Sequence, residues 1–269
     1  MIVLRSSEEI EKMRRAGRLV SGVLEMVART AAAGVTTLEL DELAEKMIRE
    51  GGARPAFKGY QPDFIKHSPF PATLCTSLND VVVHGIPDDR PLKEGDLLSV
   101  DTGAVLDGYY GDSAVSVIIG NAGLEIRRLV DVTRLALESA IGECRPGNRL
   151  SDVSHAVQKS VEEAGFSVVR RFVGHGIGTE MHEDPPVPNF GEPGNGPVLQ
   201  PGMVFAIEPM VNAGGFEVEA SPQRWPVCTK DGSLSAHFEH TVVITGGEPD
   251  VLTWPVGSHL GLEKSVRLE

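Results

Sequence analysis

The sequence predicts an α+β fold of two related halves that face each other across a shared cleft. Three observations lead to this prediction. Helical patterns alternate with β-branched runs along the chain, this order of elements occurs twice, and three short motifs recur in the same order in both halves. We expect half-repeats at approximately residues 7–120 and 123–250, joined in a single domain, residues 1–269, with an antiparallel sheet and flanking helices.

Apolar residues at helical spacing predict four helices. The first begins at Ser7, within a polar Ser-Ser-Glu-Glu start, and continues to about residue 33. The second begins near Thr37 and ends at Gly51, because a double glycine suits the C-terminus of a helix. The other two helices are expected in the second half, at residues 124–141 and 151–164.

Runs rich in β-branched residues predict the strands. These runs lie at residues 80–83, 96–105, 109–119, 168–173, 203–207 and 236–244. The second and third runs are separated by a short Leu-Asp-Gly segment, which predicts a β-hairpin. Between residues 59 and 78, prolines and aromatic residues interrupt any period, so we expect a loop there.

The recurring motifs place one histidine and one acidic residue in each half. His84 and His175 are each followed by a Gly-Ile pair. Asp101 and Glu208 each end an apolar run, and each follows a leucine by nine residues (101 − 92 = 9 and 208 − 199 = 9). Chance explains any one of these matches, but it does not readily explain three matches in the same order.

Composition and charge exclude several classes of protein. A formal net charge of −13 opposes binding to a phosphate backbone, so we expect no direct nucleic-acid partner. No apolar run is long enough for a membrane span, and the N-terminus lacks the pattern of a signal peptide. The three cysteines are far apart and lack C-x-x-C spacing, which favours a reducing compartment. We therefore expect a soluble cytoplasmic protein.

Asp101 and Asp112 lie on the two arms of the predicted hairpin. A turn centred on Leu106 and Asp107 pairs the two aspartates directly, whereas a turn at Asp107 and Gly108 pairs Asp101 with residue 114 and Asp112 with residue 103. Both registers put the two carboxylates on one face of the hairpin. Crowded carboxylates on an apolar face need a cation or a shared proton, although an isolated pair is more often explained by a solvated face.

The second half adds Glu208 and Glu239, two acidic residues in predicted buried strands, and His175 in its Gly-His-Gly-Ile motif. Any one of these residues, taken alone, is most simply explained as half of an ion pair or as a capping residue. Independent explanations of this kind do not account well for the whole group. Carboxylate oxygens with one imidazole suit Mn²⁺, Fe²⁺, Co²⁺ or Zn²⁺. Two such ions share bridging carboxylates and activate one water molecule, which favours a hydrolase over a metal store.

Three other features are candidates for a functional role. His182 follows His175 by seven residues in a glycine-rich segment, expected as a loop, and we interpret it as a substrate-facing hydrogen-bond donor rather than a metal ligand. The same glycines lack the full pattern of a nucleotide-binding loop. Cys75 lacks an acyl-transfer constellation around it, so apolar packing is the more common explanation.

With these residues in place, the chain resembles the short-form bacterial type I methionine aminopeptidases over nearly its whole length. The motifs that carry the resemblance are Val82-Val83-His84-Gly85-Ile86-Pro87, Asp101 with Asp112, Gly174-His175-Gly176-Ile177-Gly178 with His182, Ile207-Glu208-Pro209-Met210 and Phe238-Glu239-His240-Thr241. The resemblance implies a pita-bread fold of the creatinase/aminopeptidase type and the removal of initiator methionine from nascent polypeptides, in the cytoplasm and at the ribosome. It also implies a monomer.

The resemblance assigns roles to individual residues. It implies two divalent metal ions, bridged by Asp112 and Glu239, with Asp101 completing one site and His175 with Glu208 completing the other. Glu208 is the expected general base. His84 is expected to contact the scissile amide or the departing amine, and His182 the carbonyl oxygen. The expected methionine pocket is lined by Tyr60, Phe70, Cys75 and Trp225, of which Cys75 and Trp225 are equally explained as ordinary core.

The sequence departs from the family between Tyr60 and Pro71, where a short Tyr-His-Gly-Tyr-Pro stretch is replaced by a longer and altered segment. This departure concerns the rim of the expected pocket. Two alternatives remain open. One is an X-Pro-specific metallopeptidase of the same fold, which peptide panels would distinguish, and the other is a metal-free binding protein on this fold, which the filled ligand positions disfavour.

Overall fold

The computed structural model describes residues 1–62, 68–220 and 224–254. Four helices occupy the predicted positions: α1 (Ser7–Thr30), α2 (Thr37–Glu50), α3 (Leu124–Gly142) and α4 (Leu150–Glu163). The strands in the described residues are β1 (Arg54–Pro55), β2 (Leu74–Leu78), β3 (Val81–Val83), β4 (Leu97–Leu106), β5 (Tyr109–Ile118), β6 (Ser167–Val168), β7 (Gly174–Gly176), β8 (Glu183–Val187), β9 (Val204–Ile207), β10 (Met210–Asn212), β11 (Val218–Ala220), β12 (Val227–Thr229), β13 (Ser235–His237), β14 (Glu239–Val243) and β15 (Asp250–Val251).

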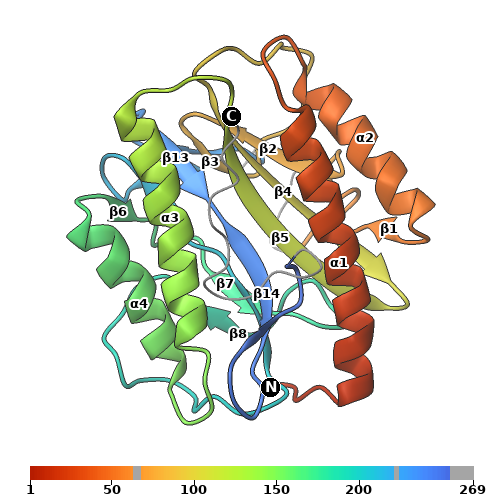
Figure 1. The fold of residues 1–269 in the computed structure, drawn as a ribbon, viewed down its shortest axis with the longest axis vertical. Helices are drawn as coiled ribbons and strands as arrows, with labels where there is room; N and C mark the ends of the chain where they lie inside the picture. The colour runs from red at the N-terminus through yellow and green to blue at the C-terminus, as the bar shows by residue number, and fades with distance from the viewer. Residues whose placement is uncertain (63–67, 221–223, 255–269) are drawn as a thin grey trace.

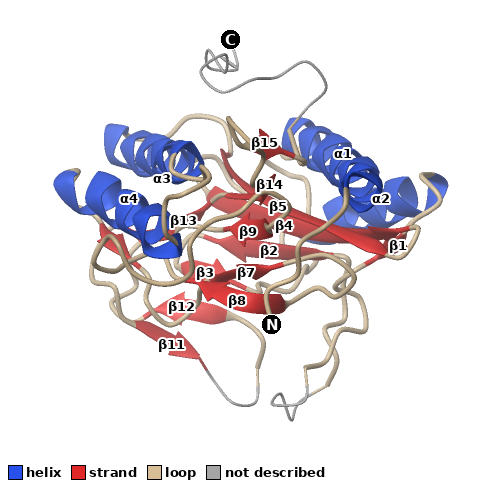
Figure 2. Cartoon of the chain, turned by 90° about the horizontal axis from the view of Figure 1, so that it is seen from below, coloured by secondary structure: helices blue, strands red, loops and turns tan. Residues whose placement is uncertain are grey.

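Helices and strands form separate layers. In Figure 2 all four helices lie on one side of the strands, and in Figure 1 α1 and α2 lie on the right while α3 and α4 lie on the left. Helix α1 packs on β4 and β5, and α3 packs against α4. The opposite face of the sheet is therefore free of these helices and available to a functional site.

The strands form one large sheet and two small ones. The nine-stranded sheet has the order β1-β4-β5-β14-β9-β7-β8, with β2 pairing with β4 and β15 pairing with β14. The three-stranded sheets are β13-β10-β6 and β11-β12-β3. Every pair for which a register is given is antiparallel. The predicted α+β class with flanking helices is confirmed, whereas the half-repeats at residues 7–120 and 123–250 stay a prediction.

The first two helices begin with reciprocal caps. The Ser6 side chain accepts a hydrogen bond from the Glu9 amide, and the Glu9 carboxylate accepts one from the Ser6 amide. Thr36 and Glu39 form the same arrangement at the start of α2. Such caps each stabilise a helix by about 1 kcal/mol, which explains why both helices begin where the polar signals predict. Helix α1 ends at Thr30, three residues before the predicted end.

The predicted hairpin is formed by β4 and β5. Its turn is Asp107-Gly108, and both residues have positive φ angles, 50° and 83°. A two-residue turn of this kind matches the twist of antiparallel strands. It pairs Asp101 with Ala114 and Gly103 with Asp112, which selects the second of the two registers that the sequence left open.

Two apolar clusters fill the space between the helices and the sheet. The larger includes Leu97, Leu129 and Phe205, and lies beneath α3 and α4. The other includes Leu40 and Leu98, and lies beneath α1 and α2. Burying a large apolar side chain stabilises a fold by roughly 1.5–3 kcal/mol, so these clusters hold the strands of the central sheet in register.

Two strand boundaries differ from the prediction because the chain changes sheets. Residues 236–244 form two strands, β13 in a small sheet and β14 in the large one, and Phe238 lies between them. The strand predicted at residues 168–173 ends at Val168, because the chain then leaves β10 and enters the large sheet as β7. A continuous β-branched run does not reveal such a change of partner.

Two segments expected as loops contain strands. The segment at residues 59–78 includes β2, which begins three residues after Pro71 and pairs with β4. The glycine-rich segment around His175 includes β7, whose pairing with β8 and β9 requires close approach of backbones. A Cβ at Gly174 would lie 2.3 Å from the Ala206 carbonyl oxygen, so glycine is needed for the pairing itself.

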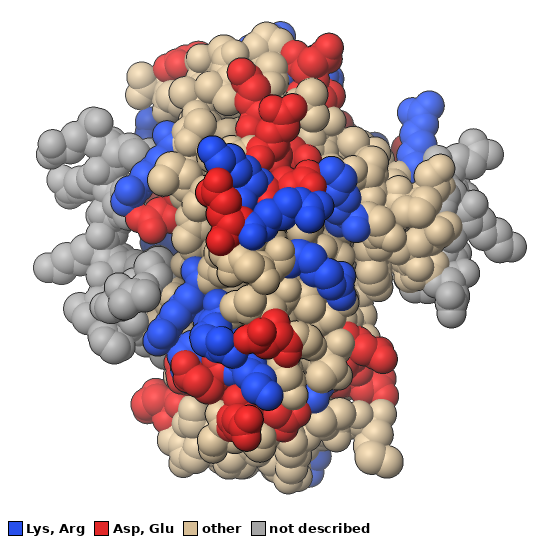
Figure 3. Space-filling view, turned by 90° about the vertical axis from the view of Figure 1, so that its right-hand side faces the viewer, with Lys and Arg blue, Asp and Glu red and all other residues tan. Residues whose placement is uncertain are grey.

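The face formed by α1 and α2 carries both signs of charge. Figure 3 shows Lys and Arg side chains intermixed with Asp and Glu over this side of the molecule. Pairs one helical turn apart include Arg29 with Glu25 and Arg49 with Glu45. Exposed pairs of this kind contribute little stability. In the described part of the chain, no helix is long and apolar enough to cross a membrane.

Candidate metal centre

The strand order brings the predicted acidic residues together at the middle of the large sheet. Asp101 on β4 pairs with Ala114 on β5, and Ala114 pairs with Glu239 on β14, so the three lie in one row. Asp112 lies two residues before Ala114 on β5, which places its side chain on the same face. The small Ala114 side chain leaves space between the carboxylates.

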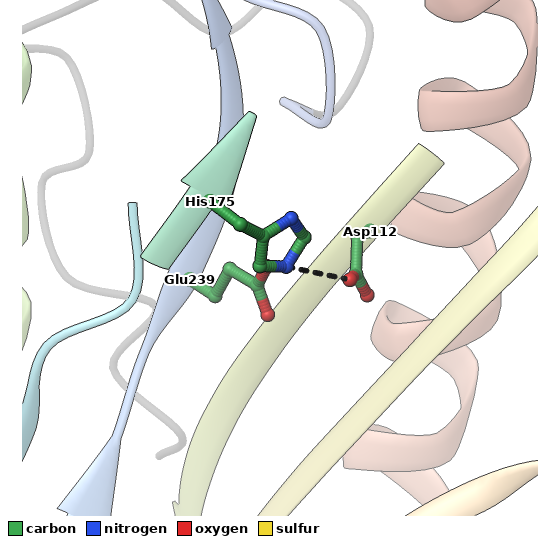
Figure 4. A group of neighbouring side chains, drawn as sticks. All are labelled: Asp112, His175 and Glu239. Atoms are coloured by element: carbon green, nitrogen blue, oxygen red, sulfur yellow. Dashed lines mark ion pairs between the residues drawn. The ribbon is translucent and has the colours of Figure 1, made fainter. Parts of the chain in front are cut away.

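The remaining two residues come from the next strands of the sheet. Glu208 directly follows β9, which pairs with β14, and His175 lies on β7, where it pairs with Ala206 of β9. The His175 Nε2 atom lies 3.6 Å from Glu208 Oε1 and 3.8 Å from Asp112 Oδ2. Figure 4 shows how Asp112, His175 and Glu239 converge from three strands, and their nearest side-chain donor atoms all lie within 4.8 Å of one another.

Burial and mutual repulsion make this group unfavourable as free anions. Burial raises the pKa values of Asp101, Glu208 and Glu239 well above the ordinary range, and the charges of neighbouring carboxylates raise them further. Burial raises the pKa of Asp112 to about 8. Without a cation, the repulsion among these carboxylates at neutral pH can be relieved only by protonation. The group therefore favours the binding of cations.

His175 is held in the neutral form that metal binding requires. Burial, together with the nearby His182, lowers the pKa of the His175 imidazole to about 3. Its Nδ1 atom lies 2.9 Å from the Gly176 carbonyl oxygen, which fixes the proton on Nδ1 because a carbonyl only accepts. The lone pair of Nε2 is therefore directed toward the carboxylates, as in a metal-ligating histidine.

Unpartnered buried oxygens show that the group fits metal ions. Within the described residues, Asp101 Oδ1, Asp112 Oδ1 and Glu239 Oε1 are buried and have no hydrogen-bond partner. An unpaired buried carboxylate costs several kcal/mol, whereas a divalent cation supplies the missing interaction. Oxygen donors with one imidazole nitrogen suit Mn²⁺, Fe²⁺, Co²⁺ or Zn²⁺. The donor set therefore fits the predicted metals.

The acidic group forms one wall of a cavity of about 830 Å³. Every site residue predicted from the sequence lines this cavity, which is the size of a small-molecule or peptide site. The residues brought together in this way are Tyr60, Phe70, Cys75, His84, Asp101, Asp112, His175, His182, Glu208, Trp225 and Glu239.

An apolar wall lies beside the acidic one. Phe70 and Trp225 pack edge to face with ring centroids 5.3 Å apart, and Cys75 and Tyr60 belong to the same cluster. Burial raises the pKa of the Cys75 thiol well above its ordinary value, so the thiolate needed for nucleophilic attack is disfavoured. Cys75 is therefore an apolar wall residue. The altered segment begins beside this wall, but its residues 63–67 lie outside the described residues.

His182 lies beside the acidic group without joining it. Its ring centroid is 4.3 Å from that of His175, and its Nδ1 atom lies 2.6 Å from the Tyr60 hydroxyl. Burial lowers the pKa of the His182 imidazole. A neutral His182 whose Nδ1 accepts from Tyr60 carries its proton on Nε2, where it is available as a donor.

His84, which also lines the cavity, has an unusual backbone conformation. Its φ is 60°, and a Cβ at the following Gly85 would lie 2.1 Å from the Thr76 carbonyl oxygen. The His84 ring packs edge to face against Phe172 and Trp225. Strained backbone of this kind concentrates at functional sites. Burial lowers the pKa of His84 to about 4, so the ring is neutral.

Sequence reasoning missed His237, which also lines the cavity. The side chain is 2% exposed, and its Nε2 atom lies 3.9 Å from Glu208 Oε2. Within the described residues this nitrogen has no hydrogen-bond partner. In the sequence His237 precedes Glu239 by two residues, a spacing that places both side chains on one face of a continuous strand. Because the chain changes sheets at Phe238, this spacing alone does not identify His237 as a site residue.

Comparison with known proteins gives the family. The family described as Metallopeptidase family M24 matches residues 11–246. The chain belongs to metallopeptidase family M24. It is 49% identical to a methionine aminopeptidase of Clostridium acetobutylicum over 254 residues, which cover 94% of this chain and 99% of the relative. It is 47% identical to methionine aminopeptidase 1 of Bacillus subtilis, again over 94% of this chain and 99% of that protein.

Solved structures of this family confirm the pita-bread fold. A methionine aminopeptidase from Thermotoga maritima superimposes with a TM-score of 0.90 at 45% identity, over 94% of this chain and 99% of that one. Prolidase from Pyrococcus furiosus superimposes with a TM-score of 0.75 at 22% identity, over 94% of this chain and 65% of that one, and shows the fold alone. The resemblance found in the sequence is thus confirmed, and M24 membership makes the chain a metallopeptidase.

Proposed function

We propose that this M24 metallopeptidase is a methionine aminopeptidase that removes the initiator methionine from nascent polypeptides. One observation carries the proposal. Four carboxylates, two of them buried and two partly buried, share a cavity with a neutral imidazole and an apolar wall, in a chain close to methionine aminopeptidases over nearly its full length. An apolar wall beside a cationic centre suits a substrate with an apolar side chain and a reactive backbone at one end.

Two divalent ions are the cofactors that this proposal requires. The residues that would hold them are Asp101, Asp112, His175, Glu208 and Glu239. When bound, the ions polarise the scissile carbonyl and lower the pKa of a water molecule, so that hydrolysis proceeds at neutral pH. Two divalent charges also balance the four carboxylates, which relieves the repulsion described above.

The protein side chains orient the substrate and move its protons. Glu208 is the proposed general base, taking a proton from the attacking water and passing it to the departing amine. The Nε2–H of His182 would donate to the carbonyl oxygen as negative charge develops there. His84 would contact the scissile amide nitrogen. Tyr60, Phe70, Cys75 and Trp225 would surround the methionine side chain and exclude water from it.

We further propose that the protein acts as a cytoplasmic monomer and meets its substrates as they leave the ribosome. Only the N-terminal residue of a nascent chain has to enter the cavity. An extended chain end can enter without local unfolding of a finished domain, so the early nascent chain is the most accessible substrate.

The first experiment measures methionine release from the peptide Met-Ala-Ser by metal-stripped protein, before and after addition of Mn²⁺ or Co²⁺. We expect metal-dependent release, reduced at least about 100-fold by Glu208→Gln, which removes the base while preserving shape. The exposed Glu163→Ala is the matched control and should retain activity. Bound metal is determined separately by elemental analysis.

The runner-up activity is tested in the same assay with Ala-Pro-Ala. Cleavage confined to X-Pro bonds would replace the proposal with a prolidase-like peptidase on the same fold. No cleavage with any metal, together with no bound metal, would favour a metal-free binding protein.

A further inference from the structure

Two arginines line the cavity that holds the acidic centre. Arg171 and Arg224 are both exposed. Each directly precedes an aromatic residue that packs against His84, with ring centroids 5.7 Å apart for Phe172 and 5.9 Å apart for Trp225. Both arginines therefore line the cavity next to residues that contact His84.

Neither guanidinium group is neutralised by an acidic side chain of the described residues. Among residues 1–62, 68–220 and 224–254, neither Arg171 nor Arg224 has an ion-pair partner within 4.0 Å. Both Arg171 and Arg170 lie over aromatic rings, 6.0 Å from the Phe172 centroid and 4.2 Å from the Phe216 centroid. Arg170 differs because it also lies 3.8 Å from a Glu162 carboxylate oxygen. Arg170 does not line the cavity, so it serves as a matched comparison in sequence and exposure.

The acidic residues at the opposite end of the β7–β8 pair already have partners. Arg171 lies before the start of β7, whereas Glu183 pairs with Gly176 at its end. The Glu183 carboxylate is bound by Arg5, and that of Asp184 by the N-terminal ammonium group of Met1. Among the described residues that line the cavity outside the acidic group, the charged side chains without an ion-pair partner are therefore the two arginines.

We infer that Arg171 and Arg224 make the enzyme select peptides with carboxylates in the residues that follow the cleaved bond. This inference rests on the proposed function, in which His84 contacts the scissile amide. The departing chain then passes His84, and successive residues of an extended chain advance about 3.3 Å each, which brings the next two or three toward the arginines. Guanidinium groups bind carboxylates with paired hydrogen bonds.

The local charge matters because the whole protein is acidic. A net charge of −13 repels an acidic peptide during its approach. Two free arginines at the rim reverse that field at the point where the peptide enters, and charge complementarity at a rim acts mainly on association and on selectivity. The expected effect is thus on KM and on its dependence on salt, with kcat for a neutral peptide preserved.

The test compares three peptides of equal length with amidated C-termini: Met-Ala-Asp-Glu-Ala, Met-Ala-Ser-Gln-Ala and Met-Ala-Lys-Lys-Ala. We expect the metal-loaded enzyme to have a higher kcat/KM for the acidic peptide than for the basic one at low salt. The double variant R171E/R224E should shift that ratio at least about tenfold toward the basic peptide. R171Q/R224Q should shift the ratio in the same direction by a smaller factor, and R170E should leave the ratio unchanged.

Each result decides the matter. An acidic-to-basic ratio that is the same in the enzyme and in R171E/R224E, with methionine still released from the neutral peptide, overturns the charge selection and leaves the proposed function standing. An equal shift in R170E also overturns it, because overall surface charge then explains the effect. No release of methionine from any of the three peptides by the metal-loaded enzyme overturns both proposals.

Discussion

The hydroxyl of Tyr60 fixes the orientation of the His182 ring. Its oxygen lies 2.6 Å from His182 Nδ1, and the two rings are 5.3 Å apart. We predict that Tyr60→Phe lowers kcat for Met-Ala-Ser about tenfold, because losing one such hydrogen bond costs about 1–1.5 kcal/mol and releases the ring from its orientation. KM should change little, since the aromatic wall is kept. Steady-state kinetics measures both constants.

A double-mutant cycle isolates this effect from general damage. If Tyr60 acts through His182, then Tyr60→Phe should cost nothing further in a protein that already carries His182→Ala. Tyr110→Phe is the control, because its hydroxyl accepts only a 3.3 Å hydrogen bond from Arg54 in the described part of the chain. Equal losses from Tyr60→Phe with and without His182 would refute the coupling.

Single residues differ in how far the sequence reveals them. The turn at Asp107-Gly108 has a local signal, so Asp101 and Asp112 could be placed on one face before the strand pairing was known. For His237 the local spacing from Glu239 does not suffice, because its contact with Glu208 depends on β13 and β9 belonging to different sheets that meet at the cavity. Local patterns therefore predict the ligand candidates, whereas long-range assembly decides their neighbours.

At the scale of elements, the N-terminal segment braces the loop that carries His182. The Arg5 guanidinium binds the Glu183 carboxylate, whose Oε1 atom also accepts from the backbone amides of Thr179 and Glu180. The two side chains are only 6% and 13% exposed. The loop approaches so closely that a Cβ at Gly178 would lie 2.0 Å from Arg5 Nη2.

We predict that Arg5→Ala lowers the free energy of unfolding by about 3 kcal/mol, because it leaves a largely buried carboxylate without its ion-pair partner. It should also lower kcat, since the loop that positions His182 loses its support. Urea unfolding and steady-state kinetics measure the two effects. Arg14→Ala is the control: its pair with Asp250 is 2.8 Å long but 43% exposed at the aspartate, so the loss should stay below about 1 kcal/mol. Equal losses for the two variants would contradict the prediction.

The elements themselves were predictable where the signal is local. Helix α2 begins and ends at its polar cap and its glycine, as the sequence indicates. The strands β7 and β8 were not predictable from local sequence, because β7 is glycine-rich and β8 contains Pro185 and Pro186. Both segments are strands only because they pair with their neighbours. Strand propensity measures how well a side chain fits a half-buried pleated surface. It therefore does not predict a short strand that forms because of its pairing partners.

At the scale of the whole molecule, the acidic centre exists only when the sheet is assembled. Its members come from β4, β5, β7 and β14 and from the residue that follows β9, and they belong to both halves of the sequence. The helices bury the opposite face of these strands and hold them in register. Folding therefore creates the repulsion among the carboxylates, and metal binding stabilises only the folded state.

This linkage predicts how the stability of the metal-free protein depends on pH. Burial raises the pKa of Asp112 from its ordinary value to about 8, so the folded state holds the proton more tightly than the unfolded state. The resulting stability is complete below about pH 4 and is lost as the pH rises toward 8. His175 acts in the opposite sense, because its pKa is lowered to about 3, but only below about pH 6.5.

Between pH 6.5 and pH 8.5 we therefore expect the Tm of the metal-free protein to fall by several degrees, at roughly 2–4 °C per kcal/mol for a chain of this size. Saturating Mn²⁺ should raise Tm at both pH values, and by more at pH 8.5, since cations bind the deprotonated carboxylates. Calorimetry with chelator or with Mn²⁺ measures this. Asp112→Asn, which does not ionise, should show a flatter metal-free profile and a smaller gain from Mn²⁺. A metal-free Tm that rises over this pH interval would mean that the carboxylates ionise in the folded protein without cost, and that the centre does not need a cation.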